Sequence, residues 1–85
     1  MEVNNTAERL RKAIAWCARS SKDYLAAREE MREAIRAHLS QYGGRGELLA
    51  IAERMKISQA GISNLKHGYG QPSIQRAKEV LEATK

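Results

Sequence analysis

The chain of 85 residues is poor in the residue types that build disulfides and metal centres. Cys17 is its only cysteine, which excludes an intrachain disulfide, and no CxxC pair or Cys/His zinc-ligand spacing occurs. The two histidines, His38 and His67, lie far apart in the sequence and match no ligand pattern. We therefore expect neither a metal ion nor a cofactor, and we expect Cys17 and His38 to be packing residues.

Long apolar runs and catalytic motifs are missing as well. No apolar run approaches the roughly 18 residues that a membrane span requires, and the N-terminus lacks the basic start and apolar stretch of a signal peptide. The Gly-Gly-Arg-Gly run at 43–46 lacks the strand and the Lys-Ser/Thr of a phosphate-binding loop. No nucleophile–base pair can be assembled. We expect a cytoplasmic protein that has no membrane partner and is not an enzyme.

Basic residues are in excess. Fifteen Lys and Arg against ten Asp and Glu give a formal net charge of +5 and a pI near 9.7. A balance of this kind favours an acidic partner such as nucleic acid. The length predicts one small domain with a marginal core, to which a partner subunit would add stability.

Helical periodicity runs along most of the chain, and strand-type alternation is rare. Leu10, Ile14 and Cys17 have the spacing of a first helix. The Ser-Ser-Lys-Asp run at 20–23 is expected to end that helix, with one of its serines capping the next. A single continuous helix over about 6–41 is the alternative.

A second apolar stripe predicts a helix that ends before the glycine-rich run, a strong stop signal. Its opposite side carries Arg28, Arg32 and Arg36 one turn apart, which we expect to form a solvated face paired with glutamates. The stripe itself comprises Tyr24, Ala27, Met31, Ala34, Ile35, His38, Leu39 and Tyr42.

The last third of the chain contains shorter elements. We predict helices at 47–55 and 59–67, separated by a three-residue turn and with Ser58 as the cap of the second. Pro72 suits the first turn of a last helix, because its missing N–H needs no partner there. The chain is thus predicted to be all-α, a compact bundle of about five helices.

Two short helices joined by a tight turn, at about 47–67, have the geometry of a helix-turn-helix. Ala52 supplies the small residue that a close helix crossing requires, and Ile62 the buried aliphatic that fixes the angle between the helices. We expect Ala52, Met55, Ile57, Ile62 and Leu65 to form the core of this unit. Its outward positions are short and mostly polar: Gln59, Ala60, Ser63 and Asn64.

The sequence of residues 51–68, IAERMKISQAGISNLKHG, followed by Gln71-Pro72-Ser73, resembles the lambda-repressor-like (XRE/Cro-type) helix-turn-helix DNA-binding family. The family pattern is LA-x-x-x-G-[IV]-S, three residues, [IV]-S-x-[LIW]-x-x-G, and then a loop ending in Pro-Ser. The resemblance covers about 46–83. It implies a sequence-specific DNA-binding protein, and it implies that Gln59, Ala60, Ser63 and Asn64 face the major groove.

Phosphate contacts complete the predicted interface. The resemblance implies them near His67, Tyr69 and Gln71, and the cations Lys56 and Lys66 are further candidates. Such contacts set the register of a protein on DNA without reading its sequence.

Three departures from the family pattern affect this interpretation. Lys56 stands where the family prefers glycine, and a left-handed non-glycine residue costs about 1 kcal/mol. Leu48 stands where many relatives have a glutamine that supports Gln59. Residues 1–22 have no counterpart, so we divide the chain into an N-terminal helical extension at 1–22 and a DNA-binding domain at 23–85.

The leading hypothesis is a homodimeric repressor of phage or prophage type, which occupies a palindromic operator in the cytoplasm of a bacterial host cell. The second is an antitoxin or another partner-binding regulator, which uses the same DNA-binding domain while its N-terminal helix docks a protein. The third is a helical adaptor without affinity for DNA. Candidate dimer residues are Leu10, Ile14, Trp16 and Cys17, which we favour because the family fold does not need their helix, and Val80 and Leu81 near the C-terminus.

Overall fold

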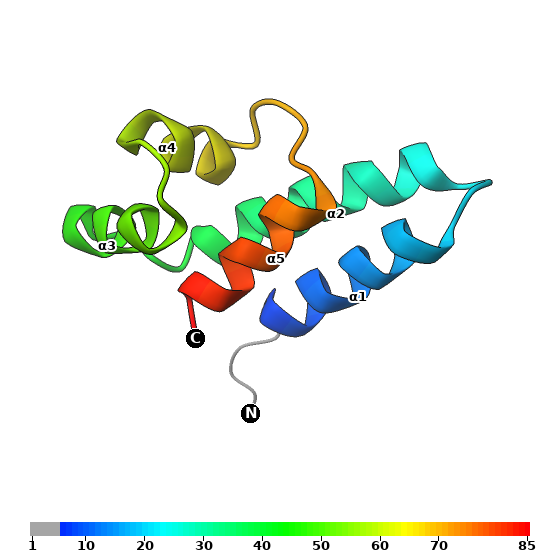
Figure 1. Cartoon of the computed structure of the whole chain (residues 1–85), viewed down its shortest axis with the longest axis horizontal. Coiled ribbons are helices and arrows are strands. Elements are labelled where there is room, and N and C mark those ends of the chain that lie inside the picture. The colour runs from blue at the N-terminus through cyan, green and yellow to red at the C-terminus, as the bar shows by residue number, and fades with distance from the viewer. Residues whose placement is uncertain (1–5) are drawn as a thin grey trace.

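A computed structural model describes residues 6–85, which form helices and, within that range, no strands. Figure 1 shows the first two helices side by side as an antiparallel hairpin, with the last helix in front and the other two near one end. The all-α prediction is confirmed. The helices are α1 (Thr6–Arg19), α2 (Tyr24–Leu39), α3 (Arg45–Met55), α4 (Gln59–His67) and α5 (Ile74–Ala83).

The loop between α1 and α2 settles the choice between one long helix and two. The chain leaves the helical state after Arg19 and re-enters it at Tyr24. The prediction of a serine cap for α2 is wrong, because the N-cap is Asp23, which makes no side-chain capping bond. Ser20 instead holds the loop, where its hydroxyl accepts a hydrogen bond from the Asp23 backbone N–H at 3.0 Å. This hydrogen bond joins the two ends of the loop just before α2 begins.

Helix α3 begins two residues earlier than the predicted start at Glu47. Gly44 is its N-cap, and the Glu47 carboxylate accepts the Gly44 backbone N–H at 3.2 Å. Glu47 therefore stands at the third helical position, where it reaches back to the cap.

The start of α5 also differs from the sequence prediction. We placed Pro72 in the first helical turn, but the helix begins at Ile74 and Ser73 is its N-cap. The Ser73 hydroxyl accepts the Arg76 backbone N–H at 3.0 Å, which satisfies one of the unpaired donors of the first turn. This bond sets the boundary, and Pro72 precedes it.

One hydrophobic core unites the described helices. Its most deeply buried large side chains include Leu10 from α1, Ile35 from α2 and Ile62 from α4. Helix α1 packs against α2 and α5, so core residues lie on both sides of the boundary expected at residue 22. Residues 1–5 of the predicted extension lie outside the described part, and the rest of that extension is one wall of the domain.

His38 links three helix ends within this core, as expected of a packing residue. Its Nε2 donates to Thr84 Oγ1 at 2.9 Å, because the Thr84 hydroxyl hydrogen is already donated to the Val80 carbonyl at 2.8 Å. Its Nδ1 is then the acceptor, 2.8 Å from Thr6 Oγ1. Desolvation by burial, and secondly the charge of Arg11, lower the pKa of His38.

The outer face of α2 is paired as predicted at two of its three arginines. Arg32 binds Glu29, and Arg36 binds Glu33 at 2.7 Å. Arg28 instead lies over the ring of Tyr24, 5.5 Å from the ring centroid. Tyr24, predicted in the apolar stripe, is instead 41% exposed at the first position of α2.

None of the helices in residues 6–85 has the length and hydropathy needed to cross a bilayer.

Candidate nucleic-acid interface

Helices α3 and α4 contact each other and are joined by only three residues, 56–58. The five side chains expected to hold them together lie as predicted on the inner side. Ala52, Met55 and Ile62 are buried, and Ile57 and Leu65 are partly buried against the same core. This packing fixes the angle between the two helices and leaves one side of α4 facing outward.

The turn between the helices contains a residue in the left-handed conformation. Lys56 adopts φ 61° and ψ 43°, and it is the only non-glycine residue with positive φ in the described chain. The conformation lets the Ile57 backbone N–H donate to the Ala52 carbonyl at 3.0 Å, which caps α3. The next residue, Ser58, starts α4 by accepting the Gly61 backbone N–H at 3.0 Å, as predicted.

The C-terminal end of α4 is held by Arg32 of α2, which the sequence analysis placed on a solvated face. Gly68 ends the helix at φ 79°, and its carbonyl accepts a hydrogen bond from Arg32 of α2 at 2.8 Å. The Tyr69 backbone N–H donates to the Asn64 carbonyl at 2.9 Å, completing the C-cap. Both ends of α4 are therefore fixed, so its outward side chains project from a rigid element.

The outward side of α4 carries the residues predicted to contact bases. Gln59, Ala60 and Asn64 are exposed and Ser63 is half-buried. Their spacing in two adjacent pairs one turn apart places them on one face of the helix. The side chains of Gln59 and Asn64 make no hydrogen bond to other residues in the described range 6–85, so their amide donors and acceptors are open to a ligand.

His67 and Tyr69 form a stacked pair at the C-terminal end of that row. Their ring centroids are 5.9 Å apart with 20° between the planes, and both side chains are exposed. His67 Nδ1 donates to the Ser63 carbonyl at 2.8 Å, so its proton is placed there and Nε2 remains for another partner. The pair thus offers a polar edge and a flat surface beside the base-contact positions.

A groove of about 600 Å³ opens between α4 and the start of α5. The N-caps of both helices, Ser58 and Ser73, lie in it, so two helix N-termini and their partial positive charge face the same space. Arg76 also lines the groove, with its guanidinium paired to the Glu79 carboxylate at 2.8 Å. The groove is lined by Ile57, Ser58, Gly61, Asn64, Leu65, Tyr69, Gln71, Pro72, Ser73 and Arg76.

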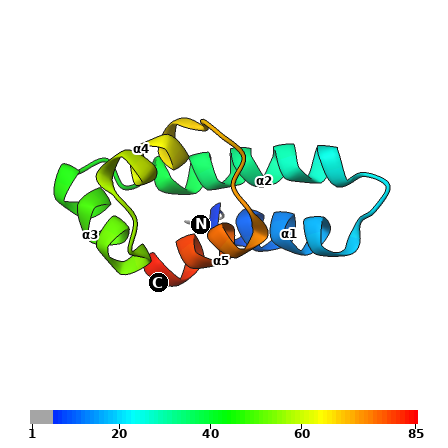
Figure 2. The ribbon, with the colours of Figure 1, turned by 45° about the horizontal axis from the view of Figure 1, so that its top comes forward.

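Sequence reasoning missed Ser73 and Arg76 as candidate contacts. They follow α4 in the chain, but only the course of the connecting loop over α2 brings them beside it (Figure 2). The available signal was the Ser73 cap itself, since capped helix N-termini favour anions.

The predicted phosphate-contact residues differ in how accessible they are to a ligand. Lys56 is exposed at the turn that precedes α4, and Lys66 is half-buried. Gln71 lines the groove, yet its side-chain amide donates to the Arg28 carbonyl of α2 at 3.3 Å. Gln71 therefore anchors the loop to α2 through one amide N–H, and keeps its other N–H and its side-chain oxygen for a ligand.

The predicted dimer residues lie mostly inside the protein. Leu10, Ile14, Cys17 and Val80 are buried in the core of a single chain. Periodicity had identified an apolar face on each helix correctly, but α1, α2 and α5 cover these faces for one another. As a surface for a second copy these four residues are excluded, and only Trp16 and Leu81 of the six remain partly exposed.

Comparison with known proteins gives no function for the chain, so a functional assignment depends on the geometry of the site. No protein-family model, no curated protein and no solved structure matches the chain. The features available for a functional assignment are therefore the exposed row on α4, the stacked pair at its end and the groove beside it.

Proposed function

We propose that the protein is a sequence-specific double-stranded DNA-binding regulator, which represses transcription by occupying an operator. The observation that carries the proposal is the outward-facing row Gln59, Ala60, Ser63 and Asn64 on a short helix fixed at both ends. A helix with short polar side chains on its outer face fits the major groove, where base edges present a distinct pattern for each base pair.

Each side chain of the row has a chemical role in this proposal. Gln59 presents a donor and an acceptor together and pairs with N7 and N6 of adenine. Ala60 meets a thymine methyl group. Ser63 and Asn64 each contribute one further hydrogen bond to a base edge.

Contacts to the DNA backbone come from residues around the row. Lys56 lies before α4, and His67 and Tyr69 lie at its end. The groove between the N-termini of α4 and α5, with Arg76 at its side, accepts a phosphate. These contacts position α4 on the duplex and make binding dependent on salt.

A palindromic operator would take two copies, one for each half-site, with their α4 helices about 34 Å apart. The residues buried in the core of one chain have no part in this pairing. In the proposed homodimer the two copies instead contact each other through exposed residues beside the DNA.

The test is selection of duplexes from a random pool by the full chain at physiological salt. The proposal predicts enrichment of one short motif in inverted repeat, and loss of that enrichment when Asn64 and Gln59 are both changed to alanine. A matched control changes two exposed residues away from α4, Ser21 and Gln75, to alanine and is expected to enrich the same motif. If the unmodified chain enriches no motif, the proposal is wrong.

A further inference from the structure

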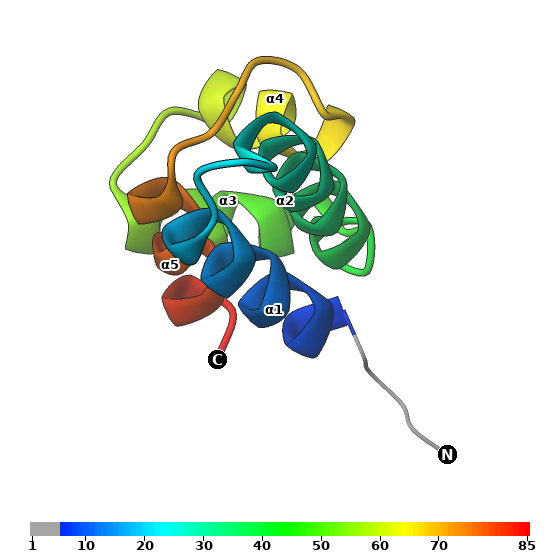
Figure 3. The same cartoon turned by 90° about the vertical axis from the view of Figure 1, so that its right-hand side faces the viewer.

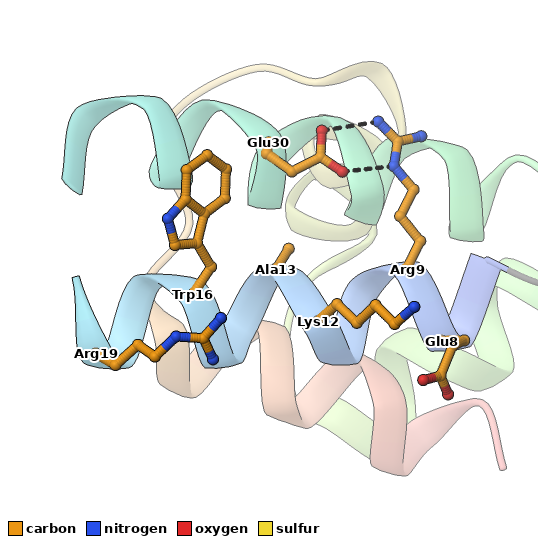
Figure 4. Close-up of a pocket in the computed structure, with 7 residues that line it drawn as sticks. All are labelled: Glu8, Arg9, Lys12, Ala13, Trp16, Arg19 and Glu30. Atoms are coloured by element: carbon orange, nitrogen blue, oxygen red, sulfur yellow. Dashed lines mark hydrogen bonds and ion pairs between the residues drawn. The ribbon is translucent and has the colours of Figure 1, made fainter. Parts of the chain in front are cut away.

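A second groove, of about 690 Å³, lies between α1 and α2, away from the row on α4. Figure 4 shows Ala13 and Trp16 pointing from α1 towards α2, so that they line the groove with apolar surface. Trp16 is half-buried against the core and is the single tryptophan of the chain. A partly exposed tryptophan in a groove between two helices is a typical anchor point for a partner helix.

The charges around the groove divide into paired and unpaired groups. Arg9 of α1 binds the Glu30 carboxylate of α2 through two hydrogen bonds, at 2.7 and 3.0 Å, and the two charges cancel (Figure 4). Lys12 and Arg19 also line the groove, but neither forms an ion pair with any residue in the described range. They stand seven residues apart on α1, which is about 10 Å along the helix.

The charge of the whole chain is concentrated on this helix. Four cations and one anion, Glu8, give Thr6–Arg19 a net charge of +3, out of +5 for the protein. Helix α4 has a net charge of +1, from Lys66. The largest positive charge on any helix is thus separate from the proposed DNA-binding row.

Two occupants of the groove are excluded, one by the position of the groove and the other by its charge. In Figure 3 α1 and α4 lie on opposite sides of the molecule, and they make no contact with each other in residues 6–85, so a duplex on α4 does not extend to this groove. A second copy of the chain would bring two helices of charge +3 face to face, and like charges repel.

We infer that the groove between α1 and α2 binds an acidic amphipathic helix of another protein. An apolar side chain of that helix packs on Trp16, while carboxylates two turns apart pair with Lys12 and Arg19. Because the groove and α4 are on opposite sides, the partner binds whether or not DNA is present. The inference does not rest on the proposed DNA-binding function.

The experiment uses the full chain as bait for a displayed library of helical peptides, randomised on one face. We expect enriched peptides to carry two acidic residues seven positions apart with apolar residues between them. Synthetic forms of these peptides should shift the emission of Trp16 to shorter wavelength, since binding removes the indole from water, and their affinity should fall with salt. Addition of the selected duplex, or of a random one, should leave this affinity unchanged.

Charge reversal supplies the decisive comparison. Lys12→Glu with Arg19→Glu should weaken peptide binding by about tenfold, because two attractions become repulsions. Lys78→Glu with Lys85→Glu removes the same net charge outside the groove and should leave binding within about twofold. All four side chains are exposed, so both double variants are expected to fold. An absence of enriched acidic peptides, an equal loss in both variants, or displacement of the peptide by duplex DNA would each overturn the inference.

Discussion

Lys56 provides the sharpest test of the turn that orients α4. The residue adopts φ 61° and ψ 43°, where an L side chain costs about 1–2 kcal/mol relative to the right-handed region. Glycine has no such cost, but it increases the entropy of the unfolded chain, which opposes folding by about 0.5–1 kcal/mol. The side chain of Lys56 is exposed and makes no hydrogen bond or ion pair with residues 6–85, so its removal sacrifices no contact. Lys56→Gly should therefore raise the free energy of unfolding by about 0.5–1 kcal/mol.

Lys56→Ala is the matched control, because it removes the same charge but keeps the β-carbon that causes the strain. Its stability should remain within about 0.5 kcal/mol of the unmodified protein. Urea denaturation followed by circular dichroism measures both differences, and thermal melting should place the glycine variant about 2–8 °C above the alanine variant. If the glycine variant is no more stable than the alanine variant, the turn is unstrained and our account of α4 orientation is wrong.

The two variants also separate folding from binding. Both lose the cation before α4, so both should bind the selected duplex more weakly, with a salt dependence reduced by about one counterion. A glycine variant that is more stable and yet binds more weakly would assign Lys56 a phosphate contact.

Three further predictions follow from the core and the caps. Leu10→Ala should cost about 2–5 kcal/mol of unfolding free energy in urea denaturation, because Leu10 is fully buried; a cost below about 1 kcal/mol would mean that α1 is a dispensable extension. His38 has its pKa lowered by burial from an ordinary value near 6.5, so the folded chain binds fewer protons than the unfolded chain, and stability should fall as the pH drops below about 6.5. This slope should be reduced in His38→Gln, and an equal slope in the two proteins would contradict the assignment. Gly68→Ala should cost about 1–2 kcal/mol by thermal melting, because alanine would have to adopt φ 79° and its β-carbon would lie 3.1 Å from Arg36 Cδ. The absence of any cost would show that the cap of α4 can rearrange.

Much of the fold could be predicted from the sequence because local signals agree with tertiary packing. Apolar spacing located the helices, Ser58 marked the start of α4, and the glycine-rich run ended α2. The boundaries that failed were set by single hydrogen bonds: Glu47 reaching back to Gly44, and Ser73 accepting from Arg76. Such bonds depend on side-chain geometry that spacing alone does not specify.

Periodicity also could not determine what covers an apolar face. The stripe containing Leu10 and Ile14 was consistent with a dimer interface or a core, and it proved to be core. The same limit applies to contacts between distant segments. Arg32 was predicted to form a solvated pair, but it also holds the carbonyl of Gly68, 36 residues away.

The candidate site, too, could be predicted only in part from the sequence. The exposure of Gln59 and Asn64 was predictable, because they are outward positions of a helix whose inward positions are apolar. The groove beside α4 and the position of the positively charged α1 opposite to it were not, since both depend on how the helices are placed in space.

The most direct test of the central claim, that the outer face of α4 reads base edges, combines Gln59→Ala with base substitutions in the selected duplex. Affinities of both proteins are measured by fluorescence anisotropy for the full set of single base-pair changes in one half-site, with Lys78→Ala as the control variant. We predict that Gln59→Ala loses about 1–3 kcal/mol on the selected duplex, and that this loss disappears when one particular A·T pair is replaced. A loss of the same size on every duplex, or no loss at all, would contradict the claim that Gln59 reads a base.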